Sequence, residues 1–408
     1  MAFLSSRSRY AINVIQEEDE VAGRLMRSGK EVMRMNRGDP PAYFPAPAYF
    51  IDAYIKALKE RKVYYSSPAG VPELREAISR RYERLYGVKS TGEDVIVTNG
   101  VSEALLFLNS ALINDGDSAV IFKPYYTQYL PDLEFYGGKA AVCDYEEDRG
   151  WEVDIDAVER SIKRSVSKDR KPKYMLITNP NNPTGTVLDK KTLSEIVEIA
   201  KNYRIFLVSD EIYDEITYNG AKFTSVSQVA KGVPHMILNG ASKGYDSTGI
   251  RIGYAFVPGD DAASLSIKNE FLNLARVRLS ANTPAQYAFA EAISNKNAHD
   301  RAISQMRSAI EKRVNLAAKL INESKYMDTV KPKGAFYLLP KLHMDCLKIK
   351  DDKEFVDKLL KEEDVWLTRG SGFGADNHAR IVALAPEAII TQAMEKIEKF
   401  CRRHSKGA

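Results

Sequence analysis

Cysteine and histidine are both scarce in this sequence. Its 408 residues include three cysteines, Cys143, Cys346 and Cys401, which lie far apart and form no CxxC spacing. An odd number of distant cysteines argues against a disulfide framework and fits a reducing compartment. The five histidines are equally dispersed, with no HxxxH pair. We therefore expect no protein-built zinc site and assign no metal.

Net charge is also low. The chain carries 59 Lys and Arg against 55 Asp and Glu, a formal net charge of +4. A charge this small over 408 residues gives no support for binding to nucleic acid or to an anionic membrane. The basic stretch at 160–173 is short and interrupted, as is typical of solvated helix flanks. We expect no nucleic-acid partner and no membrane partner.

Long apolar runs are missing as well. Nothing approaches 18 consecutive apolar residues, so no transmembrane helix is predicted. The first apolar residues are followed at once by the acidic stretch at 17–20, which excludes a signal-peptide core there. We therefore expect a cytoplasmic protein. No fixed-period repeat is visible, which excludes solenoid architectures.

What the sequence does contain is a globular composition, 44% hydrophobic and 28% charged, at a length that favours two domains. Between about 60 and 290, short β-branched runs alternate with amphipathic stretches, the pattern of parallel strands joined by crossover helices. The predicted strands are 94–98, 119–122, 174–178, 205–209, 236–238 and 253–257. Runs so uniformly apolar are expected to be buried on both faces of a sheet.

The sequence also predicts where several helices begin and end. Pro72 opens and Gly87 closes one predicted helix, and 192–203 is another. From 285 to about 324 the pattern is helical throughout, and beyond it an α+β region is expected. Its predicted strands are 335–339, 365–368 and 381–384, and its predicted helices are 353–362 and 388–401.

Ligands of an open parallel sheet bind beyond the carboxyl ends of the strands, so the residues that follow each strand carry the most information. After 94–98 comes Asn99-Gly100-Val101-Ser102 and then a helix, an arrangement that aims backbone N–H groups and a hydroxyl at an anion. A simple helix-capping turn is the alternative. After 174–178 the segment NPNNPTG (179–185) holds its asparagines between prolines, although a plain loop would also fit.

Two further strand ends carry reactive groups. Asp210 follows the strand 205–209, with Tyr213 three positions later, and a carboxylate there favours a cation, although an N-cap aspartate is the alternative. Lys243 and Arg251 bring two positive charges of different kinds to another strand end, after 236–238. A lysine whose pKa is lowered by burial becomes a nucleophile, whereas a guanidinium suits bidentate phosphate binding. A surface role for Lys243 is the alternative, but apolar runs flank its segment on both sides.

Taken in order, NPNNPTG, SDEIY, NGASK and GIRIGY resemble the motifs of the class I/II pyridoxal-phosphate-dependent aminotransferases. Further matches in the same order are GDP at 38–40, Tyr65 with PAGVPELR at 68–75, KPKGAFY at 331–337 and GSGFG at 370–374. The resemblance covers about residues 30–400.

The resemblance implies an α/β fold of the fold-type I class. Its large domain, with a mostly parallel sheet sandwiched by helices, is expected at 50–290. A smaller α+β domain is expected from 1–49 together with 291–408. The resemblance also implies a homodimer with shared active sites.

For catalysis, the resemblance implies that Lys243 binds pyridoxal 5′-phosphate as a Schiff base and carries the proton between the substrate and the cofactor. Asp210 corresponds to the aspartate that pairs with the pyridinium nitrogen. Tyr213 and Asn182 correspond to the donors that hold the phenolate oxygen of the cofactor.

Other positions match residues that hold the ring and the phosphate. Tyr126 corresponds to the aromatic ring stacked on the pyridine, while Tyr125 and Tyr129 receive no role. The phosphate is expected to contact Val101, Ser102, Ser242 and Arg251, with Tyr65 reaching it from the other subunit.

For the substrate, Arg380 matches the arginine that grips the α-carboxylate as a two-pronged salt bridge, with Gly38 and Asn182 lining the same pocket. The stretch 275–286 and the GSGFG run look most like archaeal and bacterial alanine aminotransferases. Ser102 stands where one aspartate-using subgroup has a lysine. An amino-group transfer from alanine to a 2-oxo acid such as 2-oxoglutarate is therefore favoured.

Several alternatives stay open. Arg37, Arg276 or Arg278 could supply a cation for a second carboxylate, so an aspartate aminotransferase fits the same sequence, as does an aromatic amino acid aminotransferase. A carbon–sulfur lyase or synthase that uses the same cofactor is a more remote alternative, since fold alone does not determine the reaction.

Overall fold

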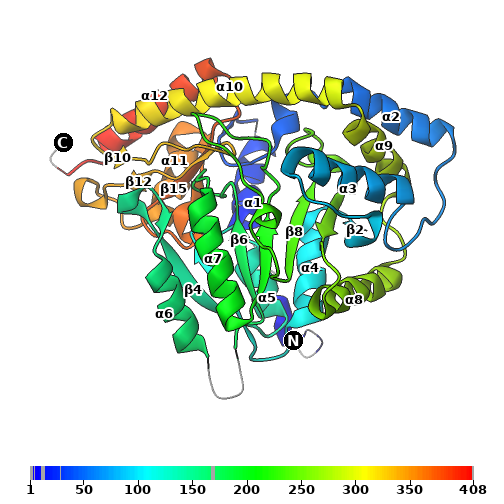
Figure 1. The fold of residues 1–408 in the computed structure, drawn as a ribbon. Coiled ribbons are helices and arrows are strands. Elements are labelled where there is room, and N and C mark those ends of the chain that lie inside the picture. Colours follow the sequence, from blue (N-terminus) through cyan, green and yellow to red (C-terminus); the bar gives the residue numbers. More distant parts are fainter. Residues whose placement is uncertain (1–2, 4, 11–13, 28, 167–170, 407–408) are drawn as a thin grey trace.

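A central sheet of eight strands organises the computed structural model, which describes residues 3, 5–10, 14–27, 29–166 and 171–406 (Figure 1). In spatial order the strands are β2 (Val95–Thr98), β9 (Gly253–Phe256), β8 (His235–Gly240), β7 (Phe206–Asp210), β6 (Tyr174–Thr178), β3 (Ser118–Lys123), β4 (Lys139–Glu146) and β5 (Glu152–Val153). The strands from β8 to β4 pair in parallel, β9 is antiparallel to both its neighbours, and β5 is antiparallel to β4. The predicted mostly parallel sheet is confirmed, and all six predicted strands begin and end within two residues of their predicted bounds.

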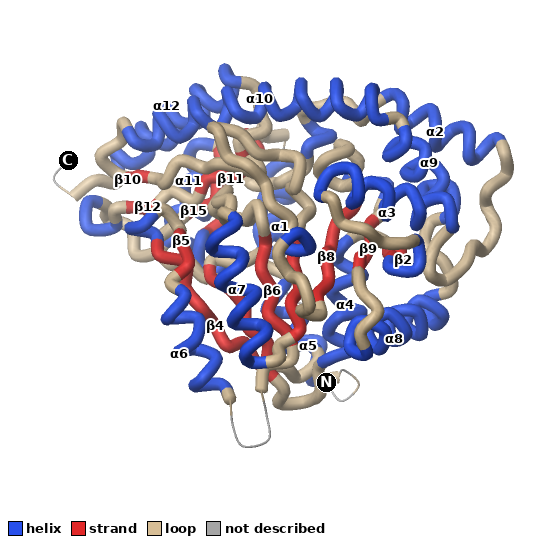
Figure 2. Tube along the Cα trace, in the orientation of Figure 1, coloured by secondary structure: helices blue, strands red, loops and turns tan. Residues whose placement is uncertain are grey.

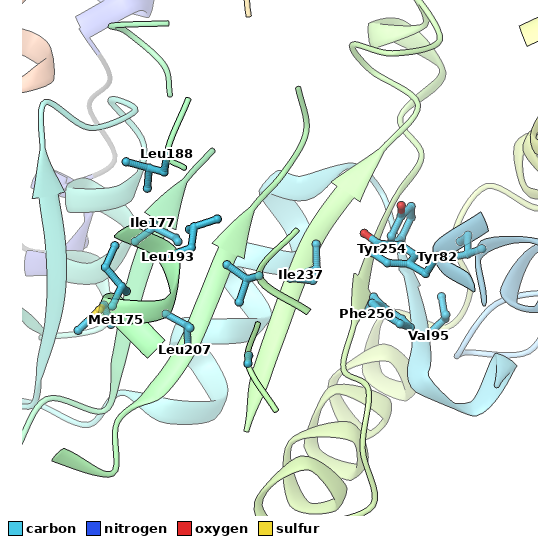
Figure 3. Close-up of a cluster of buried hydrophobic side chains, with 14 of the residues drawn as sticks. Tyr82, Val95, Met175, Ile177, Leu188, Leu193, Leu207, Ile237, Tyr254 and Phe256 are labelled. Atoms are coloured by element: carbon cyan, nitrogen blue, oxygen red, sulfur yellow. The ribbon is translucent and has the colours of Figure 1, made fainter. Parts of the chain in front are cut away.

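Both faces of this sheet are buried, as the apolar runs predicted. Along β6, β7 and β8 alternate residues enter two different cores, because successive side chains of a strand point to opposite faces. Met175, Leu207 and Ile237 lie in the core shown in Figure 3, together with Tyr82, Val95 and Phe256. Leu176, Val208 and Met236 lie in the core on the opposite face.

Helices cover each face. The core of Figure 3 is closed by α2 (Ala48–Lys59), α3 (Pro72–Tyr86), α6 (Ile155–Ser165), α7 (Lys190–Tyr203) and α9 (Thr283–Ser294). The other face is closed by α4 (Val101–Leu112), α5 (Tyr129–Phe135) and α8 (Ala262–Arg278). Pro72 begins α3 and Gly87 ends it with a left-handed φ of 67°, which confirms both predicted ends.

A third core gathers the C-terminal part of the chain. It contains residues of α10 (Lys296–Asn322), α11 (Asp352–Glu363) and α12 (Glu387–Arg403), and Figures 1 and 2 show α10 running along one border of the molecule. The helical pattern predicted from 285 to 324 is broken at Asn295, where α9 ends and whose side chain caps α10. The third core also contains Ile212 and Tyr213 from the loop after β7. The domain limits at 49/50 and 290/291 remain predictions.

Short strands complete this part. β11 (Tyr337–Leu338) and β14 (Thr368–Arg369) flank β15 (Ala379–Val382), and β10 (Met327–Asp328) pairs with β12 (Lys341–Leu342). β1 (Met33–Arg34) pairs in parallel with β13 (Val365–Trp366), and α1 (Val14–Arg27) packs near β14. In the part of the chain that the structure describes, no helix has the length and apolar character needed to cross a membrane.

Leu207 offers a direct test of the central sheet. It is fully buried on β7, and Leu207→Ala should lower the free energy of unfolding by about 2–5 kcal/mol because the cavity left behind is only partly refilled. Leu265→Ala is the matched control, since Leu265 lies on α8 and is 45% exposed; its effect should stay within about 0.5 kcal/mol. Urea denaturation of the three proteins measures both values, and equal losses in the two variants would contradict this placement.

Candidate active site

One cavity of about 720 Å³ brings together nearly all the residues predicted for the site. Its lining includes Gly38, Val101, Ser102, Tyr126, Asn182, Asp210, Tyr213, Ser242, Lys243, Arg251 and Arg380. The topology explains this convergence, because β2, β3, β6, β7 and β8 all end at one edge of the sheet. Arg251 joins them because it precedes β9, which runs in the opposite direction and therefore begins at that same edge.

Tyr65 is the one predicted residue that lies elsewhere. It is 80% exposed in the segment between α2 and α3, and it does not line the cavity of its own chain. Its predicted contact with the phosphate needs a second subunit and stays a prediction.

The start of α4 forms one end of the cavity. Gly100 precedes the helix with a φ of 82° and gives no side-chain cap, so the amides of Val101 and Ser102 begin the helix at the cavity wall. Arg251 lies beside them and donates from Nη1 to the Thr248 carbonyl at 2.8 Å. A Cβ on Gly100 would collide with the Arg251 guanidinium, so only glycine allows this approach. A helix N-terminus beside an arginine is a binding site for a phosphate group.

Asp210 ends β7 as a buried carboxylate. Tyr129 donates its hydroxyl to Oδ2 at 2.7 Å, and the Ile212 amide donates to Oδ1 at 3.2 Å. Burial raises the pKa of Asp210 to about 6, and the hydrogen bond from Tyr129 opposes that rise. Because Asp210 lines the cavity, its carboxylate can pair with a cationic group that enters there.

Lys243 is held in the cavity by a neutral acceptor. Its Nζ donates to the carbonyl oxygen of Gly38 at 2.6 Å. Burial lowers the pKa of Lys243 to about 8, Asp39 opposes this shift, and the nearby positive charges of Arg380 and Arg251 add to it. A substantial neutral fraction near pH 8 makes this amine a nucleophile and a proton acceptor.

Arg380 is buried, with an exposed fraction of 2%. It donates from Nη2 to the Asn36 carbonyl at 2.6 Å and from Nη1 to Oδ1 of Asn182 at 3.0 Å. Burial lowers its pKa. Arg380 forms no ion pair with any residue that the structure describes, so its charge is available to a carboxylate from solution.

The three arginines considered for a second carboxylate are placed differently. Arg37 lines the cavity. Arg278 does not line it and is paired with Glu103 at 3.0 Å. Arg276 is exposed on α8 and donates to Asn273 at 2.9 Å. Of the three, Arg37 alone is positioned to contact a bound substrate.

Two residues that the sequence left without a role belong to the site. Tyr129 contacts Asp210, and Tyr337 lines the cavity with its hydroxyl 2.8 Å from that of Tyr213. Tyr129 stood in a run of three tyrosines at 125–129, and Tyr337 stood in the KPKGAFY match. Each motif was visible, but the contact itself joins residues 81 and 124 positions apart and left no local signal.

These residues fit pyridoxal phosphate. The helix N-terminus and Arg251 suit its phosphate, Asp210 suits its ring nitrogen, and the Lys243 amine suits its aldehyde. The missing Cβ of Gly100 leaves room for Arg251 at the phosphate end.

Comparison with known proteins agrees with this chemistry. A family model described as aminotransferase class I and II matches residues 31–397. The aspartate aminotransferase of Bacillus subtilis is 32% identical over 389 residues, covering 94% of this chain and 95% of that protein. The glutamate-pyruvate aminotransferase of Haemophilus influenzae is 33% identical over 380 residues, covering 92% of each.

The structure is also similar to solved structures of other aminotransferases. The alanine aminotransferase of Pyrococcus furiosus superposes with a TM-score of 0.92 at 37% identity, covering 98% of this chain and 100% of the other. The aspartate aminotransferase of Thermus thermophilus with maleate gives 0.88 at 30% identity, with the same coverage.

The lowered pKa of Lys243 leads to a measurable reactivity. In cofactor-free protein, acylation of Lys243 by acetic anhydride should rise with pH around a midpoint near 8, because only the neutral amine reacts. Mass spectrometry of the peptide that carries Lys243 follows the rate. Arg380→Met should move the midpoint upward, since it removes a positive charge that lowers the pKa. A midpoint near the ordinary value of 10.5 in the unmodified protein would show that burial does not perturb this amine.

Proposed function

The chain belongs to the class I and II aminotransferases, and on that premise we propose that it transfers the amino group of alanine to a 2-oxo acid, with 2-oxoglutarate as the acceptor. It is a transaminase of fold type I that depends on pyridoxal phosphate. Bound in the cavity, that cofactor supplies an aldehyde that condenses with amines and a ring that withdraws electrons from the substrate Cα.

The chain's own residues then position and move protons. Lys243 is proposed to take the proton from the substrate Cα on its Nζ, for which its lowered pKa is suited. Asp210 is proposed to keep a proton on the ring nitrogen, while Asn182 and Tyr213 orient the ring oxygen. Arg380 is proposed to bind the α-carboxylate with both of its terminal nitrogens, which fixes the Cα–H bond relative to Lys243.

The proposal that alanine is the amino donor rests on Ser102. It lines the cavity at the position where the resemblance places a lysine in one aspartate-using subgroup. A short neutral hydroxyl there cannot form the ion pair that such a lysine makes with a side-chain carboxylate. The similarity to an alanine aminotransferase at 37% identity and to a glutamate-pyruvate aminotransferase at 33% identity supports the same donor.

A dicarboxylic acceptor calls for a second cation in the cavity. Among the cationic residues that line it, Lys243, Arg251 and Arg380 hold hydrogen bonds to neighbouring residues. Arg37 also lines it, next to Asn36, whose carbonyl accepts from Arg380. We therefore assign Arg37 to the distal carboxylate of 2-oxoglutarate.

Arg37 also supports a second candidate, aspartate as the donor. Aspartate carries a second carboxylate at a similar position, and relatives at about the same identity are named aspartate aminotransferases. The two candidates differ in the amino acid that reacts first with the loaded enzyme.

We further propose that the enzyme is a cytoplasmic homodimer. Exposed apolar side chains occur on α2 at Ile51, Ile55 and Leu58, and in the following segment at Val63, Tyr64 and Tyr65. Their exposure in a single chain is typical of an interface between subunits. In such a dimer Tyr65 is proposed to reach the phosphate in the cavity of the other subunit.

A half-reaction distinguishes the donors. Single amino acids are added to the loaded enzyme, and absorbance follows conversion of the cofactor to its pyridoxamine form. Alanine should convert it at least about tenfold faster than aspartate, because Ser102 offers no charge to a second carboxylate. Lys243→Ala should lose this conversion and all steady-state turnover. Faster conversion by aspartate would show that aspartate, and not alanine, is the donor. Retained turnover in Lys243→Ala would overturn the role assigned to Lys243.

Arg37 is tested by the choice of acceptor. With alanine as donor, Arg37→Met should raise the KM for 2-oxoglutarate about tenfold, because a charged hydrogen bond is lost. The KM for 2-oxobutyrate, which lacks the distal carboxylate, should change little. Arg276→Met is the matched control, since Arg276 is exposed and does not line the cavity of its own chain. Equal changes with both acceptors would remove Arg37 from the acceptor site.

A further inference from the structure

Tyr337 is a cavity residue to which the family resemblance gives no role. It lies on β11, is 2% exposed, and lines the cavity together with Tyr213 and Arg380. Its hydroxyl oxygen lies 2.8 Å from the hydroxyl oxygen of Tyr213. The centroid of its ring lies 4.8 Å from Cζ of Arg380. One side chain therefore contacts both a predicted cofactor residue and the predicted carboxylate residue.

We propose that Tyr337 is a positioning residue for both ends of the reacting centre, its hydroxyl directing the proton of Tyr213 into the cavity and its ring fixing the guanidinium of Arg380. This inference rests on the roles proposed above for Tyr213 and Arg380.

The hydroxyl argument follows from counting hydrogens. Each phenol has one hydrogen to donate and two lone pairs to accept. If Tyr213 donates to Tyr337, the hydrogen of Tyr213 is used within the pair. If Tyr337 donates to Tyr213, the hydrogen of Tyr213 is left for an acceptor in the cavity, where an anionic oxygen of the cofactor is expected. The direction of this hydrogen bond therefore decides whether Tyr213 can donate to that oxygen, and the proposal requires Tyr337 to be the donor.

Burial keeps both hydroxyls protonated, which this argument requires. It raises the pKa of Tyr337 to about 12 and raises that of Tyr213 further above its ordinary value. Neither phenol loses its hydrogen at neutral pH, so the pair always has two hydrogens to place.

The ring argument concerns the charge of Arg380, which forms no ion pair within the described part of the chain. The guanidinium of Arg380 faces the ring of Tyr337 and also that of Phe373, whose centroid lies 4.5 Å from Cζ. Aromatic faces attract a guanidinium without neutralising it. The arginine is therefore held in place while its charge stays available to a substrate carboxylate.

The backbone fixes Tyr337 from two sides. β11 pairs with β15, which sets Tyr337 opposite Val382 and places Arg380 on the neighbouring strand. Gly38 lies against the hydroxyl, and a Cβ at that position would collide with it. The ring is therefore confined between a sheet and a glycine, which suits a residue that orients others.

Two substitutions separate the hydroxyl from the ring. Tyr337→Phe keeps the ring and removes the hydroxyl, whereas Tyr337→Leu removes both. Tyr326→Phe is the matched control, because Tyr326 is buried in the same core but does not line the cavity. For each protein three quantities are measured: the Kd of pyridoxal phosphate for the cofactor-free enzyme, the pH midpoint of the visible band of the loaded enzyme, and the KM and kcat for alanine.

Tyr337→Phe should weaken cofactor binding about 3- to 10-fold, the value of one hydrogen bond. It should also shift the midpoint of the visible band in the same direction as Tyr213→Phe and by a smaller amount, while the KM for alanine stays within about twofold. Tyr337→Leu should in addition raise the KM for alanine about tenfold, since Arg380 loses its support. Tyr326→Phe should leave all three quantities unchanged.

A result in which Tyr213→Phe shifts the band and weakens the cofactor but Tyr337→Phe does neither would overturn the proposal and leave the role of Tyr213 intact. If Tyr213→Phe itself has no effect, the role proposed for Tyr213 fails, and the hydroxyl part of the inference fails with it. If Tyr337→Leu retains the KM of the unmodified enzyme while Arg380→Met does not, the ring part is wrong. Because Tyr337→Phe changes a single atom, its readouts stay interpretable even if Tyr337→Leu does not fold.

Discussion

The guanidinium of Arg380, which is buried and forms no ion pair with any described residue, is the constraint on which the rest of the site depends. Burial of an unpaired charge is unfavourable unless neutral acceptors compensate for lost water. Here the Asn36 carbonyl, the side-chain oxygen of Asn182 and two aromatic rings do so, each from a different segment of the chain. On the role proposed for Arg380, a substrate carboxylate gains a strong partner there, which favours amino acids over amines that lack a carboxylate.

The part of the cavity formed by the sheet depends on strand direction. Parallel strands that end at one edge place Asp210, Asn182 and Lys243 near one another, and the reversed β9 contributes Arg251 from its beginning. On the roles proposed above, the sheet supplies groups for the cofactor, whereas the segments around Gly38 and β15 supply groups for the substrate. Lys243 spans the two, since its Nζ contacts the Gly38 carbonyl. The proton transfer proposed for Lys243 is therefore located where these two sets of groups meet.

The sequence was most informative where a motif is short and local. The strands, the ends of α3 and the residues after each strand could be predicted because apolar runs, Pro72 and Gly87 act within a few positions. Contacts across the chain could not be predicted. The pairing of Tyr213 with Tyr337 and of Asp210 with Tyr129 depends on how β11 and α5 pack, and nothing in the spacing encodes that. Asn295 was missed because the helical pattern of the sequence continues on both sides of it, and a single capping residue does not interrupt that pattern.

The parallel pairing of β1 with β13 has a consequence for biosynthesis. Met33 lies opposite Val365, and the carbonyl of Asn36 accepts from Arg380, a separation of 344 residues. The ribosome synthesises Met33 and Asn36 long before Val365 and Arg380. The part of the cavity that contains Arg380 therefore cannot form during most of translation. The eight-stranded sheet, whose strands lie between residues 95 and 256, can assemble earlier. In a nascent chain the sheet that carries Asp210 can therefore form before Arg380 reaches Asn36, and the cavity is complete only near the end of synthesis.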